Sequence, residues 1–75
     1  MTILTNKTAL PIFVKNFNKL FEDSGMSQRK LSTAIGVTQS RISYWVHGWS
    51  LPTFVNLYNL SIAFNCRLED FYRED

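Results

Sequence analysis

The chain has 75 residues, of which 45% are hydrophobic and 19% are charged, so it has the composition of one small globular domain and not of a disordered segment. Its single cysteine excludes an internal disulfide and a cysteine-based zinc site, and no apolar run approaches the 18 residues of a membrane span. Residues 1–66 carry six bases against two acids (net +4) and residues 67–75 two bases against four acids (net −2), so a basic body with an acidic tail underlies the net charge of +2.

The first helix is expected after Pro11, because a proline is well tolerated in a first helical turn. Gly25 is placed to end this helix in the left-handed conformation. We therefore expect residues 1–11 to be an N-terminal arm and residues 12–75 to form the domain. Apolar residues recur along one helical face at Leu10, Phe13, Val14, Phe17, Leu20 and Phe21.

Two short helices are expected next, joined by Gly36-Val37-Thr38. Ser27 can cap the first of them, and Thr38 can cap the second, which Gly48 would end. The inward residues of the two helices are expected to be Leu31, Ala34, Ile35, Ile42, Trp45 and Val46. Two such helices around a tight turn predict helix-turn-helix geometry.

A fourth helix is expected from Phe54 to about Phe64, with Asn65 ending it in the left-handed conformation. It is apolar nearly all round, so it is either central to the fold or covered by a partner. A last helical turn is expected over 68–72, which makes an all-α fold with five helices. The two apolar stripes of the fourth helix are Leu57, Leu60 and Phe64 on one side and Val55, Tyr58 and Ile62 on the other.

A family resemblance becomes visible over residues 25–52, which read GMSQRKLSTAIGVTQSRISYWVHGWSLP. This segment resembles the helix-turn-helix of phage Cro and repressor proteins, and the resemblance covers about residues 12–72. It implies a compact five-helix lambda-repressor-like domain. It also implies a small phage or prophage regulator of transcription that binds a double-stranded DNA operator.

The third helix is the expected reading element, since its outward side is polar or amphipathic and has no carboxylate. Gln39 can bond an adenine edge bidentately, and Tyr44 can lie against a thymine methyl or reach a phosphate. For Arg41, phosphate contact is favoured over base contact. By the resemblance, Gln28 and the first amides of its helix hold a phosphate. The expected DNA-binding residues are Gln28, Thr38, Gln39, Ser40, Arg41, Ser43, Tyr44 and His47.

Further phosphate contacts are expected near these residues. Trp49 could instead cover the core. The expected set is Ser27, Arg29, Lys30, Trp49 and Thr53.

Two positions depart from the family pattern in a way that affects packing. Phe21 and Val46 stand where many members have a buried arginine and glutamate, and the joint loss of both charges predicts that the two side chains pack together. On the fourth helix, apolar residues replace polar ones and predict a homodimer interface, unless the arm residues Ile3 and Leu4 fold over them. The interface candidates are Val55, Tyr58, Ile62, Phe71 and Tyr72.

No residue pattern predicts catalysis, a metal site, a cofactor or a small-molecule ligand. His47 is the single histidine and Cys66 the single cysteine, so neither has a partner of its own kind for a metal site. The start of the chain lacks the apolar core of a signal peptide, so we expect a cytoplasmic protein. Two alternatives stay open: an antitoxin or restriction-control protein that also binds a protein partner, and a helical interaction module without DNA binding.

Overall fold

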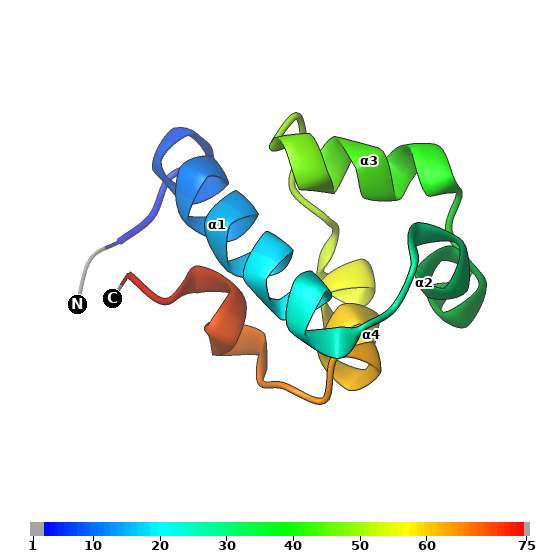
Figure 1. Ribbon diagram of the computed structural model, residues 1–75. Helices are drawn as coiled ribbons and strands as arrows, with labels where there is room; N and C mark the ends of the chain where they lie inside the picture. The colour runs from blue at the N-terminus through cyan, green and yellow to red at the C-terminus, as the bar shows by residue number, and fades with distance from the viewer. Residues whose placement is uncertain (1–2, 75) are drawn as a thin grey trace.

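The structure is a computed structural model that describes residues 3–74, and all regular structure in this range is helical (Figure 1). The expected all-α class is therefore confirmed. No helix within residues 3–74 is both long enough and apolar enough to cross a membrane. The elements are α1 (Asn6–Ser24), α2 (Gln28–Ile35), α3 (Gln39–His47), α4 (Phe54–Ala63) and the 3-10 helix η1 (Leu68–Tyr72).

The first helix begins earlier than expected, at Asn6, and Pro11 lies inside it. Thr5 and Thr8 form a reciprocal capping box, in which the Thr5 N–H donates to the Thr8 hydroxyl at 2.9 Å and the Thr8 N–H to the Thr5 hydroxyl at 3.3 Å. The expected arm over residues 1–11 is corrected accordingly, because residues 6–11 are the first turns of α1.

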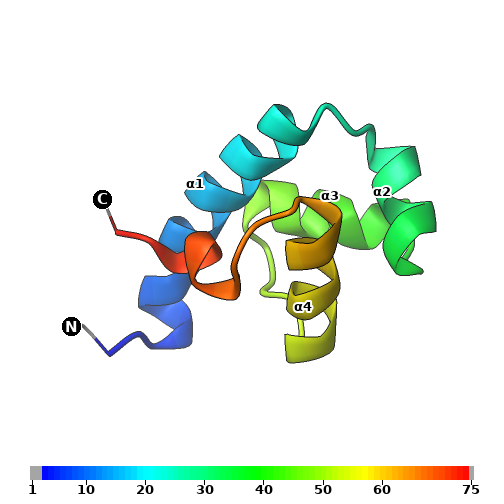
Figure 2. The same cartoon turned by 90° about the horizontal axis from the view of Figure 1, so that it is seen from below.

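The helices enclose one core to which each of the five elements contributes. α1 packs against α3 and η1, α2 packs against α3 and α4, and η1 lies against α4 (Figures 1 and 2). Phe17 sits at the centre, with its ring 5.4 Å from the ring of Phe13 and edge-on to Trp45 at 6.2 Å. The fully buried core side chains are Phe13, Phe17, Leu31, Ile42, Trp45, Leu60 and Phe71.

Phe21 and Val46 both flank this core as half-buried side chains. The ring of Phe21 lies 5.6 Å from that of Phe17 and 5.9 Å from that of Phe64. Direct contact between Phe21 and Val46 stays a prediction. A polar link joins the same helices, because the Asn18 amide donates to the Val46 carbonyl at 3.0 Å and so ties α1 to the end of α3.

The expected last helical turn is a 3-10 helix and not an α-helix. Its start is fixed by Asp70, whose carboxylate accepts the Arg67 N–H at 2.9 Å and the Arg73 guanidinium at 2.7 Å. These bonds, the backbone one first, lower the pKa of Asp70. The Asn16 amide donates to the carbonyls of Phe71 and Arg73 and so holds η1 against α1.

Candidate nucleic-acid interface

The helices α2 and α3 have the capping residues that the sequence predicts. The Ser27 hydroxyl accepts the Lys30 N–H at 3.1 Å, and the Thr38 hydroxyl accepts the Arg41 N–H at 3.2 Å. Gly36 ends α2 with φ +73°, a conformation that residues with a Cβ rarely adopt. These three residues fix where α2 begins and ends and where α3 begins, whereas Gly48 ends α3.

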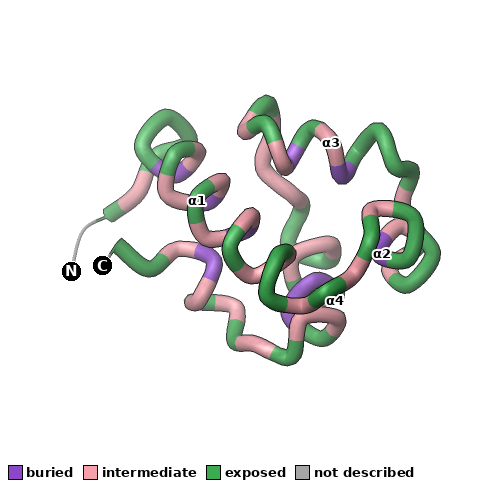
Figure 3. The backbone as a smooth tube through the Cα atoms, viewed as in Figure 1, coloured by how far each residue is buried: buried purple, intermediate pink, exposed green. Residues whose placement is uncertain are grey.

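The outward side of α3 is bare. Ile42 and Trp45 are fully buried and Val46 is half-buried, so these three define the inward side. In Figure 3, exposed residues alternate with buried and intermediate ones along α3, and no other segment passes over the outer side of this helix. Of the predicted reading residues, Ser43 is half-buried, and the exposed ones are Thr38, Gln39, Ser40, Arg41, Tyr44 and His47.

The charged side chains on α2, α3 and α4 are all basic. No aspartate or glutamate occurs between Asp23 and Glu69, a stretch that contains α2, α3 and α4. Arg29, Lys30 and Arg41 are all exposed, and no salt bridge within residues 3–74 neutralises them. The three helices α2, α3 and α4 therefore present no carboxylate of their own to a polyanion.

The N-terminus of α2 offers free donors next to α3. Gln28 is its first residue and is half-buried, whereas Ser27 before it is exposed. The Ser27 hydroxyl accepts the Lys30 N–H and none of the earlier amides of the helix. The N–H groups of Gln28 and Arg29 therefore make no hydrogen bond within the described chain. Two unpaired amides at the positive end of a helix favour an anion.

The loop after α3 places an aromatic cluster at the end of that helix. The N–H of Trp49 donates to the Tyr44 carbonyl at 2.8 Å and that of Gly48 to the Trp45 carbonyl at 3.2 Å, which is a Schellman motif. The Trp49 ring stacks on His47 at 4.6 Å and meets the edge of Tyr44 at 5.7 Å. Trp49 is 67% exposed, so the alternative that it covers the core is wrong.

The outer face of α4 is apolar and uncovered. Val55, Tyr58 and Ile62 are 64%, 51% and 62% exposed, and Phe54, which the sequence reasoning did not single out, is 70% exposed. We call these four residues the α4 patch. Ile3 is 92% exposed, and the described N-terminal residues lie far from α4 in both views, so they do not cover the patch (Figures 1 and 2).

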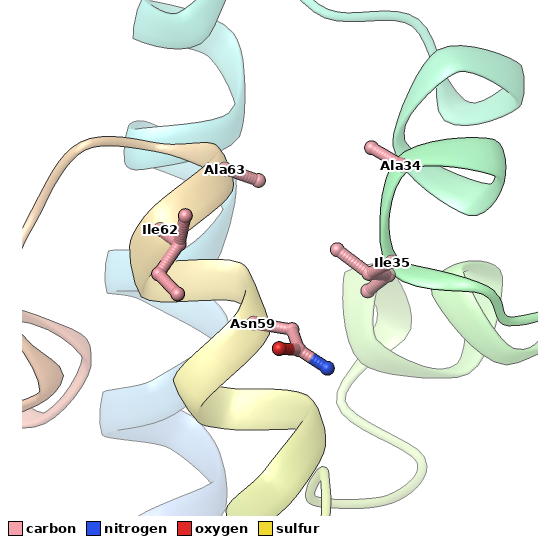
Figure 4. Close-up of a pocket in the computed structure, with 5 residues that line it drawn as sticks. All are labelled: Ala34, Ile35, Asn59, Ile62 and Ala63. Atoms are coloured by element: carbon pink, nitrogen blue, oxygen red, sulfur yellow. The ribbon is translucent and has the colours of Figure 1, made fainter.

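Beside the α4 patch, a shallow groove separates α2 from α4. Ala34 and Ile35 line its α2 side, and Asn59, Ile62 and Ala63 line its α4 side (Figure 4). The groove exists because Ala34 and Ala63 have small side chains that do not fill the space between the two helices. Ile62 belongs both to this groove and to the α4 patch. The groove thus continues the α4 patch toward α2.

Two expected interface residues lie elsewhere. Phe71 is fully buried, and its ring packs against those of Phe13 and Phe64, so its assignment to a dimer surface is corrected to the core. Tyr72 is half-buried with its ring 5.8 Å from Phe13, and burial raises the pKa of its hydroxyl. The reason is that η1 is folded back against α1 and cannot extend the α4 patch.

Cys66 and the acidic side chains of residues 3–74 were the remaining candidates for chemistry. Burial, and then the nearby Asp70 carboxylate, raises the pKa of the Cys66 thiol, which therefore stays protonated at neutral pH. No group of three or more histidine, cysteine, aspartate or glutamate side chains within residues 3–74 could hold a metal ion.

Comparison with known proteins agrees with this geometry. The helix-turn-helix family model matches residues 18–71, which is 54 of the 75 residues and includes α2, α3 and α4 entirely. Searches of curated proteins and of solved structures give no significant match.

Proposed function

Because the chain belongs to the helix-turn-helix family, in its Cro/repressor type, and so is a DNA-binding regulator, we propose that it recognises a specific duplex sequence with α3 in the major groove. The observation that carries this proposal is the bare outer side of α3. It has hydroxyl, amide, aromatic and cationic groups and no carboxylate. A solvated helix face without a nucleic-acid partner usually mixes both signs of charge.

The base-reading residues we propose lie along the exposed side of α3. Gln39, at the helix start, hydrogen-bonds an adenine edge through its amide. Ser40 and Tyr44 follow it on the outer side and contact neighbouring base pairs. Thr38, Ser43 and His47 complete this surface, with hydroxyl and imidazole groups that reach base edges or adjacent phosphates.

Phosphate contacts flank this reading surface. The amides of Gln28 and Arg29, together with the Gln28 side chain, hold one phosphate at the N-terminus of α2. These contacts fix the register of α3 and do not select sequence. Further phosphate contacts are assigned to Ser27, Lys30, Arg41, Trp49 and Thr53.

We further propose that the protein acts as a homodimer and represses transcription by occupying an operator with two half-sites. The α4 patch is the interface, because it is apolar, uncharged and exposed. Four side chains of this size, about two-thirds exposed, offer roughly 400–500 Å² per copy. A standard interface uses about 800 Å² per partner, so the dimer is weak alone and is strengthened when two copies occupy half-sites about one DNA turn apart.

The α4 patch also favours a second candidate function. An antitoxin or a restriction-control protein would bind DNA through α3 in the same way and use this patch and the groove in Figure 4 for a different protein. Self-association separates the two candidates. A homodimeric repressor binds its operator cooperatively as a pure protein, whereas a partner-dependent regulator does so only when the partner is added.

The proposal is tested by enrichment of a random-sequence duplex pool on the purified protein, followed by titration of the enriched duplex at several salt concentrations. We expect an enriched motif and a log–log salt slope of about −4 to −5, as for a protein that neutralises about five phosphates. Scrambled duplex of equal length is the control. An unenriched pool, or binding that salt does not weaken, would contradict DNA recognition by α3.

A further inference from the structure

A hollow of about 400 Å³ lies on the outer side of α3, within the proposed reading surface. It is lined by Thr38, Ser40, Arg41, Tyr44 and Ser50, so it spans the first two turns of α3 and the loop that follows. The hollow opens on the side of the helix opposite to the buried residues Ile42 and Trp45. Whatever the major groove presents to α3 therefore meets this hollow.

The inner surface of the hollow is largely apolar. The half-exposed ring of Tyr44 provides the largest apolar face. Thr38 also lines the hollow, and because its hydroxyl accepts the Arg41 N–H at 3.2 Å, the methyl group is the part of this side chain that makes no hydrogen bond. Ser40, Arg41 and Ser50 are the polar residues of the lining.

The Tyr44 ring is held in place before any ligand arrives. Trp49 meets it edge-on at 5.7 Å and is itself stacked on His47 at 4.6 Å. The backbone N–H of Trp49 donates to the carbonyl of Tyr44 at 2.8 Å, so the helix end and the ring cluster form one unit. A ring fixed in this way costs little conformational entropy when it is covered.

We infer that this hollow takes the 5-methyl group of a thymine, so that the protein reads one thymine in each half-site by shape. Among the base edges in the major groove, thymine alone presents an apolar group, whereas the others present hydrogen-bond donors and acceptors. An aromatic face with a methyl beside it matches that group better than it matches a phosphate, whose oxygens need donors. The inference rests on the proposed function, because it assigns one contact within the same DNA complex.

The test uses the duplex enriched on the wild-type protein, with each thymine replaced in turn by deoxyuridine in both half-sites. Deoxyuridine lacks only the methyl group. At one symmetric position we expect binding to weaken about fourfold per half-site, the effect of uncovering one methyl-sized group. Deoxyuridine at flanking thymines is the matched control and is expected to change nothing.

Two variants separate the ring of Tyr44 from its hydroxyl. Tyr44→Phe keeps the ring and is expected to keep the preference for thymine over uracil, whereas Tyr44→Ser is expected to lose it. Because Tyr44 is half-exposed, both variants are expected to fold, which circular dichroism checks.

The inference is overturned if no deoxyuridine weakens binding, or if the preference survives in Tyr44→Ser. It is also overturned if Tyr44→Phe and Tyr44→Ser lose equal affinity on every sequence, since that result assigns the hydroxyl to a phosphate. A pool without enrichment would instead refute the proposed function itself, so the two failures are distinct.

Discussion

Replacement of Phe71 by alanine is expected to destabilise the fold by about 3–5 kcal/mol, the usual loss for a buried phenylalanine. The side chain is fully buried, and its ring lies 6.0 Å from Phe13 and 6.2 Å from Phe64. Each aromatic pair adds about 0.5–1.5 kcal/mol to what burial contributes, which favours the upper half of the range. A domain of this size has a total stability of about 4–11 kcal/mol, so the variant lies close to the limit of folding.

Urea unfolding followed by circular dichroism at several protein concentrations measures this loss. With a urea dependence of about 1 kcal/mol per molar, we expect the midpoint to fall by about 3 M or more, equally at every concentration. Phe54→Ala is the matched control, since Phe54 is 70% exposed, and we expect its effect to stay within about 0.5 kcal/mol at low protein concentration. If the free energy of unfolding falls by less than about 1 kcal/mol, or falls only at high protein concentration, Phe71 lies in an intermolecular interface and not in the core.

Three further predictions concern DNA binding, self-association and pH. Gln39→Ala is expected to weaken binding of the enriched duplex by about 1–3 kcal/mol and to relax base choice at one position. Gln28→Ala is expected to weaken binding of enriched and scrambled duplexes alike. Gel-shift titrations measure both effects, and the reverse pattern would contradict both assignments. Ile62→Glu is expected to abolish cooperative operator binding and to leave the affinity for a single half-site unchanged. Sedimentation measures self-association and DNA titration measures cooperativity. Preserved cooperativity would exclude the α4 patch as the dimer interface. Because the pKa of Asp70 is lowered in the folded state, its stabilising effect is complete above the ordinary carboxyl pKa near 4 and is lost as pH falls through the lower folded value. Thermal unfolding of Asp70→Asn should therefore depend less on pH in that acidic range, and an unchanged acid dependence would refute the role of this carboxylate.

Most of the fold was predictable, because its boundaries are encoded locally. Ser27, Gly36 and Thr38 specify the ends of α2 and α3 through caps and a left-handed glycine, and each works as predicted. The early start of α1 was missed because Thr5 and Thr8 cap it without the usual glutamate or glutamine, while Pro11 offered a competing start.

The surface was predictable only where one helix decides it. The outward side of α3 follows from helical periodicity, since Ile42 and Trp45 must face the core and residues half a turn away must not. Phe71 and Trp49 could not be placed in this way, because their burial depends on how η1 and the loop after Gly48 fold back onto other elements. The exposure of Phe54 could not be predicted either. The sequence of α4 is apolar on nearly all sides, so it does not show which side of the helix faces the core.

Recognition of duplex DNA in the proposed way requires that α3 present its outer side to the base edges. Amide-resolved NMR titration of the protein with the enriched duplex tests this most directly. We expect the largest shifts on residues 38–47, together with Gln28 at the start of α2. Shifts confined to α4, with the amides of α3 unmoved at saturating DNA, would contradict it.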